Sequence, residues 1–309
     1  MIKKIITLLS ALAFFSNQAF ALFETTYWGV RALGMGGAFT AVADDSNALM
    51  YNIAGTGEME KPEVSFMSSK LFTSLDGVDW GANYLAGVYP LDKRYGTLSA
   101  SWASFANTGY RREDTFSLGY AREMDDVLKM LDIEWVSVLA GINFKYLMTE
   151  TIDDDTSKYS SSGFTFDLGL LFRFEYGISF GYSNKYLTRP DMGYWQEDRI
   201  KHTNVLGLSY YSEEIPFFKI PRFTAALDYE MREGSNLIIF GLESKMIDGK
   251  LAVRAGGWES QVNFGLGYIF DFGGILEDSR LYIDYAFGLP LEVTDSTGSH
   301  FLSITFRFP

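Results

Sequence analysis

The chain has 309 residues, a formal net charge of -13 at pH 7 and no cysteine, which excludes disulfides and thiol chemistry. The acidic balance argues against binding to nucleic acid, because that needs clustered Lys and Arg, and the sequence has no basic patch. Aromatic residues make up 17% of the chain although its mean hydropathy is +0.00. This combination is typical of a membrane β-barrel, in which every second residue of a strand faces lipid.

Residues 1–21 have the order of a secretory signal peptide. Lys3 and Lys4 precede an apolar run over residues 5–15, and the small-x-small triplet Ala19-Phe20-Ala21 follows. The apolar run is shorter than the roughly 18 residues that a membrane-spanning helix needs, so we predict cleavage after Ala21. Cleavage leaves about 288 residues with a net charge of about -15 and no cysteine for a lipid anchor.

Residues 22–62 do not alternate and are rich in small residues. Gly34, Gly36 and Gly37 allow backbone turns that are closed to other residues, so such a segment can pass through a narrow space. Asp45 or Ser46 is a candidate cap for a short helix over residues 48–50. A flexible linker is the simpler interpretation, but the apolar content predicts packing against something. The glycine spacing does not fit a nucleotide-binding loop.

Residues 63–309 alternate between apolar and polar or small residues in segments of strand length, separated by turn sequences. Together they predict an all-β, transmembrane antiparallel β-barrel of about 14 strands. The clearest strands cover residues 136–146, 164–174, 223–230, 262–270 and 281–287. Weaker strands lie near 63–72, 80–90, 95–105, 114–122, 176–186, 200–211, 237–246, 250–258 and 300–308.

The strand count also predicts the connections. With both ends of the barrel in the periplasm, Asp248-Gly249 forms a tight periplasmic hairpin, and residues 151–162 and 187–199 are outer loops. The soluble alternative is a β-sandwich or a lipocalin-like barrel with its apolar face inside. Small residues on the polar faces, such as Gly119, Gly169 and Gly207, favour the membrane barrel because they leave room in a lumen.

The last strand places Leu302, Ile304, Phe306 and Phe308 on one face. A terminal aromatic residue is typical of strands that the barrel-assembly machinery recognises, although Pro309 follows it here. The sequence therefore predicts outer-membrane lipid and that machinery as partners, in a bacterium of the Gram-negative type.

Charged residues on the inward faces carry both signs, which favours internal pairing over the selection of a substrate. These predicted luminal charges are Lys145, Asp167, Arg173, Asp228, Glu230, Arg254, Asp284 and Arg307. His202 and His300 are the only histidines, and neither has a partner for nucleophilic catalysis, so we predict no enzyme activity. Asp153, Asp154 and Asp155 lack the pattern of a calcium loop, so we predict no metal and no cofactor.

Residues 36–55 resemble the N-terminal hatch of FadL-type outer-membrane transporters and of the related PorV/PorQ proteins. The family's Asn-Pro-Ala-Gly sequence matches Asn52, Ile53, Ala54 and Gly55, with isoleucine in place of proline. The resemblance implies a 14-stranded barrel that residues 22–62 plug from the periplasmic side. The candidate hatch and gating residues are Gly36, Gly37, Asp44, Asp45, Asn52, Ile53, Ala54 and Gly55.

The resemblance implies passive passage of small hydrophobic molecules, such as fatty acids, through a barrel that the hatch gates. The alternative is a PorV-like barrel that transports nothing and docks or shuttles cargo for secretion or surface attachment. A plain porin is a third possibility, against which an internal plug argues.

Overall fold

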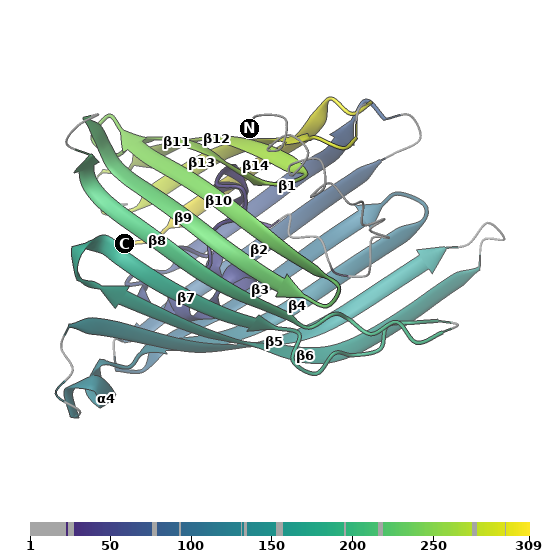
Figure 1. The fold of residues 1–309 in the computed structure, drawn as a ribbon, viewed down its shortest axis with the longest axis horizontal. Coiled ribbons are helices and arrows are strands. Elements are labelled where there is room, and N and C mark those ends of the chain that lie inside the picture. Colours follow the sequence, from purple (N-terminus) through teal and green to yellow (C-terminus); the bar gives the residue numbers. More distant parts are fainter. Residues whose placement is uncertain are drawn as a thin grey trace, which may run out of the picture.

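The computed structural model describes residues 23, 28–75, 79–92, 94–130, 132, 135–152, 157–194, 196–215, 219–273, 277–293 and 295–309. The predicted signal peptide and Asp153, Asp154 and Asp155 lie outside these residues. The described chain forms a closed, fully antiparallel barrel of 14 strands, which confirms the predicted fold class (Figure 1). Each strand pairs with its neighbours in sequence, and β1 closes the barrel against β14.

The strands are β1 Glu63–Thr73, β2 Trp80–Asp92, β3 Gly96–Asn107, β4 Arg111–Glu123, β5 Val136–Ile152, β6 Lys158–Phe174, β7 Ile178–Lys185, β8 Thr203–Ile215, β9 Ile220–Arg232, β10 Ser235–Met246, β11 Leu251–Trp258, β12 Gln261–Asp271, β13 Arg280–Pro290 and β14 Gly298–Arg307. The short helices are α2 Val30–Gly34, α3 Ala48–Tyr51, η1 Ile53–Glu58, α4 Asp125–Met130 and η2 Glu175–Gly177. In the described parts of the chain, no helix has the length and hydropathy to cross a membrane.

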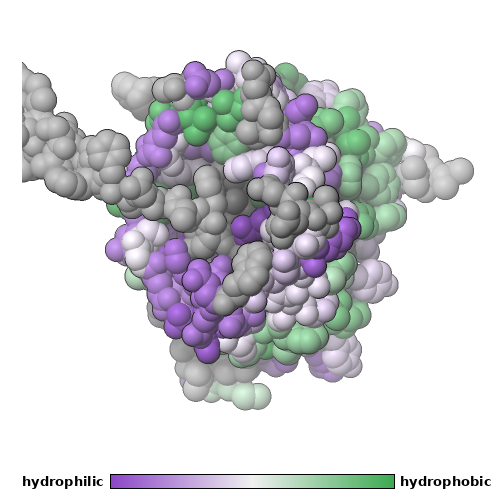
Figure 2. Space-filling model, turned by 90° about the vertical axis from the view of Figure 1, so that its right-hand side faces the viewer, coloured by the Kyte–Doolittle hydropathy of each residue, from purple (hydrophilic) through white to green (hydrophobic). Residues whose placement is uncertain are grey.

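The apolar face of the barrel wall points outward. On β14, Leu302 and Ile304 are 51% and 47% exposed, whereas the alternate residues Phe301 and Ser303 are buried. A soluble barrel would bury the apolar face as its core, so this orientation excludes the lipocalin-like alternative. Figure 2 shows one end of the barrel, with hydrophilic residues around a central hollow and hydrophobic residues along the flank.

Two predicted connections differ from the structure. Most of the outer loop predicted over 151–162 is strand, because β5 and β6 stay paired from Val136↔Phe174 to Ile152↔Lys158. The Asp248-Gly249 turn is longer than a two-residue hairpin: residues 247–250 connect β10 to β11, and Ile247, Asp248 and Gly249 all have positive φ.

Residues 28–62 lie inside the barrel, and we call them the luminal segment (Figure 1, purple). Its helix α2 contacts β11 to β14, and η1 contacts β3 to β6 on the opposite side. Almost every residue from 30 to 56 is buried. The segment also touches the closure of the barrel, since Glu63 on β1 accepts the Ser46 amide at 2.9 Å and pairs with Arg307 on β14 at 2.7 Å.

Candidate functional site

Several inward positions of the wall are glycine where the luminal segment comes close to it. A Cβ atom added at Gly207 would lie 2.8 Å from the Ala41 nitrogen, and one added at Gly141 would lie 3.0 Å from the Ala54 nitrogen. We call this set the glycine collar: Gly119, Gly141, Gly169, Gly181, Gly207, Gly241, Gly256 and Gly265. The room that the sequence predicted inside the barrel is therefore filled by backbone from the luminal segment.

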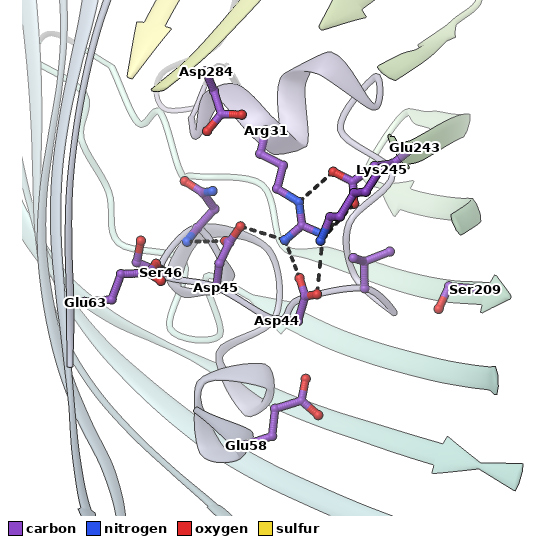
Figure 3. A network of polar contacts seen from close by, with 12 residues as sticks. Arg31, Asp44, Asp45, Ser46, Glu58, Glu63, Ser209, Glu243, Lys245 and Asp284 are labelled. Carbon is purple, nitrogen blue, oxygen red and sulfur yellow. Dashed lines mark hydrogen bonds and ion pairs between the residues drawn. The ribbon is translucent and has the colours of Figure 1, made fainter. Parts of the chain in front are cut away.

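Arg31 on α2 connects three carboxylates (Figure 3). Its guanidinium donates to both carboxylate oxygens of Glu243 on β10, at 2.9 Å each. It also donates to Asp44 at 2.6 Å and to Asp45 at 2.9 Å. A planar fork with several donors suits bidentate carboxylate binding, so Arg31 ties two parts of the luminal segment to the wall.

The Arg31 network continues through the wall itself. Glu243, which is 1% exposed, also accepts from Arg254 on β11 at 2.6 Å, and Arg254 reaches Asp284 on β13 at 2.6 Å. Burial of these charges is costly unless each has a partner, and here the two arginines share Glu243. Burial also raises the pKa of Asp45, which lies outside the strands, to about 6, although the charge of Arg31 acts in the opposite direction.

A second group of contacts fixes residues 39–42. Asp228 on β9 accepts the amides of Phe39 and Thr40 at 3.1 and 2.9 Å. Arg173 on β6 donates to the carbonyls of Ala41 and Val42 at 2.7 and 2.8 Å and pairs with Glu58 of η1. Wall side chains therefore satisfy backbone groups that have no strand or helix partner there.

Asn52 joins the luminal segment to β6. Its amide donates to the carbonyls of Thr40 and Leu170 at 2.9 Å each, and its carbonyl oxygen accepts the Ala54 amide at 3.2 Å. Ile53, at the position of the family's proline, packs on the collar: a Cβ at Gly119 would lie 2.6 Å from its terminal methyl group. The Asn52 hydrogen bonds thus fix the turn that proline would otherwise restrict.

The other predicted hatch residues have local roles. Gly36 and Gly37 have φ of 69° and 89° in the turn after α2, and Gly55 lies against Ala43. Asp45 accepts the Asn47 amide at 2.8 Å, but the residue before α3 is Asn47, so neither Asp45 nor Ser46 is its N-cap. Asp44 binds Arg31, a partner that the sequence analysis did not identify.

The remaining predicted luminal charges point inward and lie in pairs. Lys145 lies 2.5 Å from Asp167, and Glu230 lies 2.5 Å from Arg232. In the described part of the chain, no group of three or more His, Cys, Asp or Glu side chains is placed to hold a metal ion.

A small hollow, with a cavity volume of about 20 Å³, lies between the luminal segment and β5 to β9. It is lined by Phe23, Trp28, Met50, Lys145, Lys185, Tyr186, Thr203, Glu230 and Arg232. Lys185 is buried, and no carboxylate of the described residues lies within 4 Å of its ammonium group. That group faces the ring of Tyr51, whose centroid is 5.5 Å away. The inward alternation of β7 predicts the direction of the Lys185 side chain. No nearby sequence feature predicts that, among the described residues, this side chain has no carboxylate partner.

Three aromatic rings from β1, β2 and β3 pack together inside the barrel. The ring of Trp80 on β2 meets Phe72 and Phe105 edge to face, with centroids 5.5 and 5.9 Å apart. Phe72 follows a bulge in β1, has a φ of 48°, and donates its amide to Ser299. An aromatic cluster thus lies near the ends of β1 to β3, away from the charged hollow at β5 to β9.

We predict that Gly207→Val lowers the free energy of unfolding by about 1–3 kcal/mol, because its side chain would overlap the backbone of Ala41. Urea unfolding in lipid bilayers measures the change. Gly87→Val is the matched control, since a Cβ there meets nothing within 4 Å. Equal effects of both substitutions would contradict close contact at the collar.

We predict that Arg31→Met lowers the free energy of unfolding by about 3–5 kcal/mol, since buried carboxylates lose their cation. Glu243→Gln should lower the free energy of unfolding less in the Arg31→Met chain than in the unchanged chain. The difference between the two effects, which is the coupling energy, should be at least about 0.5 kcal/mol. Urea unfolding of the four chains gives that coupling. Arg199→Met, in an exposed pair with Glu197, is the control. Strict additivity would show that Arg31 and Glu243 act independently.

The sequence matches no protein-family model and no curated protein. The fold is similar to that of the Ralstonia pickettii toluene transporter TbuX, with a TM-score of 0.59, 12% identity and coverage of 93% of this chain and 100% of that one. A Pseudomonas aeruginosa FadL homologue has a TM-score of 0.58, 11% identity and coverage of 93% and 99%. The CymD monoaromatic hydrocarbon channel has a TM-score of 0.52 and 13% identity, with coverage of 91% of this chain and 97% of that one. At sequence identities this low, the structural similarity shows a shared fold and nothing more.

Proposed function

We propose that this chain is an outer-membrane channel through which small hydrophobic molecules pass passively when the luminal segment shifts. The observation that carries the proposal is the way the lumen is filled. A segment of the chain itself occupies it through non-covalent contacts, and beside it lies a hollow that contains Phe23, Trp28 and Met50. Because non-covalent contacts alone hold it against the wall, the luminal segment can move without breaking the barrel wall.

The outward apolar face supports the membrane location. Aromatic residues stand on that face towards both ends of the strands, for example Phe308 just after β14 and Tyr229 near the opposite end of β9. Rings at these levels suit the interface between hydrocarbon and headgroups. The comparison proteins are named as a toluene transporter and a monoaromatic hydrocarbon channel, which is consistent with an apolar ligand.

The hollow also favours one class of ligand over another. Its rings and Met50 suit an apolar body, and they offer dispersion contacts rather than a directed hydrogen bond. Lys185 is buried, and among the described residues no carboxylate lies within 4 Å of its ammonium group, so an anionic head gains a charge-assisted contact there. We therefore propose amphiphiles with a carboxylate, such as fatty acids, in preference to neutral hydrocarbons.

A disulfide between the luminal segment and the wall tests the shift. A Cβ at Gly207 would lie 2.9 Å from the Thr40 Cβ, so Thr40→Cys with Gly207→Cys needs a movement of under about 1 Å to reach disulfide geometry. The chain has no cysteine of its own, so only this bond forms. Uptake of radiolabelled oleate is measured in a Gram-negative host that lacks its own channel for it.

We expect oxidised cells to lose oleate uptake and reduced cells to regain it, while each single-cysteine variant responds to neither treatment. Equal uptake in oxidised and reduced cells would contradict gating by the luminal segment. Uptake no greater than in cells without the protein would contradict transport altogether.

We predict that Lys185→Met lowers oleate uptake by about tenfold, since one charge-assisted contact is lost, and leaves toluene uptake unchanged. Lys219→Met is the control, because Lys219 is exposed and pairs with Glu214 near the other end of the barrel. Equal losses for oleate and toluene would contradict a role for Lys185 in recognising the carboxylate.

A PorV-like docking barrel is the second candidate. The observation that favours it is the dense set of contacts on the luminal segment, since the Arg31 network and Arg173 oppose movement. A barrel that serves as a docking site needs no movement. Cross-linking of the chain to a secreted cargo protein, together with failure of oleate uptake, would favour this candidate.

A further inference from the structure

The outward faces of β1, β2 and β14 change from apolar to polar at one level. The change follows the register, in which outward residues of the three strands lie beside one another: Phe66 with Leu85 and Ile304, Ser68 with Asn83 and Leu302, and Lys70 with Gly81 and His300. With the chain ends in the periplasm, this level is the outer edge of the apolar surface on these three strands. Headgroups of the outer leaflet lie at such an edge.

Lys70 differs from the other cations at the outer end of the barrel. Arg112 pairs with Asp114 at 2.7 Å, Lys158 with Glu150 at 3.4 Å, and Arg189 with Glu233 at 2.7 Å. Lys70 is exposed, and no carboxylate of the described residues lies within 4 Å of its ammonium group. In a chain of net charge -13, an exposed lysine with no carboxylate of the described residues beside it leaves a local positive charge for an external anion.

His300 lies directly across from Lys70 in the β1–β14 ladder and is exposed on the same face. Its Nδ1 is 2.7 Å from the Tyr285 hydroxyl, and its ring centroid is 5.3 Å from that of Phe287. When the hydroxyl donates to Nδ1, the ring proton is on Nε2, which becomes a hydrogen-bond donor. The two aromatic neighbours hold the ring in place on the surface.

We propose that Lys70 and His300, oriented by Tyr285, bind the phosphate of an outer-leaflet lipid. This inference rests on the membrane location proposed above. A phosphate accepts hydrogen bonds from several donors, and an ammonium beside an imidazole N–H supplies two at neighbouring positions. Leu302 lies one outward position below His300 and Phe66 two below Lys70 on the same face, and both side chains suit the acyl chains of that molecule. An anion attached to hydrocarbon therefore fits this position better than a free one.

The test uses the purified full chain in a neutral detergent, titrated with bisphosphorylated lipid A, with dephosphorylated lipid A and with inorganic phosphate. Binding is followed by the rise in the temperature of thermal unfolding. We expect a rise with phosphorylated lipid A only. Lys70→Gln with His300→Gln should weaken that binding by at least about tenfold, and Tyr285→Phe should weaken it less, because the imidazole remains. Lys158→Gln, outside the patch, should bind as the unchanged chain does.

Equal affinity of the unchanged and the doubly substituted chain would overturn the proposal. So would an equal response to dephosphorylated lipid A, or to inorganic phosphate. Fractionation of cells separates this result from the proposed function. A chain that fractionates with the outer membrane but ignores lipid phosphate contradicts the binding site alone, whereas a chain outside that membrane contradicts both.

Discussion

The structure depends on one steric constraint, which is that two backbones share the width of a single barrel. A 14-stranded barrel has an interior wider than side chains alone fill, and the luminal segment takes up the difference. It fits because the collar glycines present no Cβ where the segment passes, for example at Gly141 and Gly265. Residues with side chains return above and below this level. The collar thus fixes both the depth and the path of the segment.

Close backbone contact leaves no room for water, and this explains the charged side chains around the collar. The amides of Phe39 and Thr40 and the carbonyls of Ala41 and Val42 have no partner in a helix or strand. Asp228 accepts from the two amides, and Arg173 donates to the two carbonyls. The charges introduced in this way need partners of their own, and Arg31, Glu243 and Arg254 form a shared set.

Strand number, strand faces and most strand ends could be predicted from the sequence, because a period of two is a local property. The sequence does not predict the extension of β5 and β6, because Ser160, Ser161 and Ser162 are typical of a loop, although they pair with residues 148–150 of β5. The inward direction of the Lys145 and Asp284 side chains can also be predicted from the sequence. The ion pairs between inward charges cannot, because residues such as Arg31 and Glu243 are far apart in sequence and only barrel closure brings them together. Ile53 shows the same limit, since its contact with Gly119 depends on the position of β4.

The contacts of Glu63 constrain the order of assembly. Glu63 at the start of β1 binds the luminal segment through Ser46 and the end of β14 through Arg307, so one carboxylate joins parts of the chain made first and last. Contacts across this sequence separation form late, because a long loop has to close before they contribute free energy. This carboxylate therefore couples the position of the luminal segment to the closure of the wall. A shift of the segment around Ser46 acts directly on the seam between the first and the last strand.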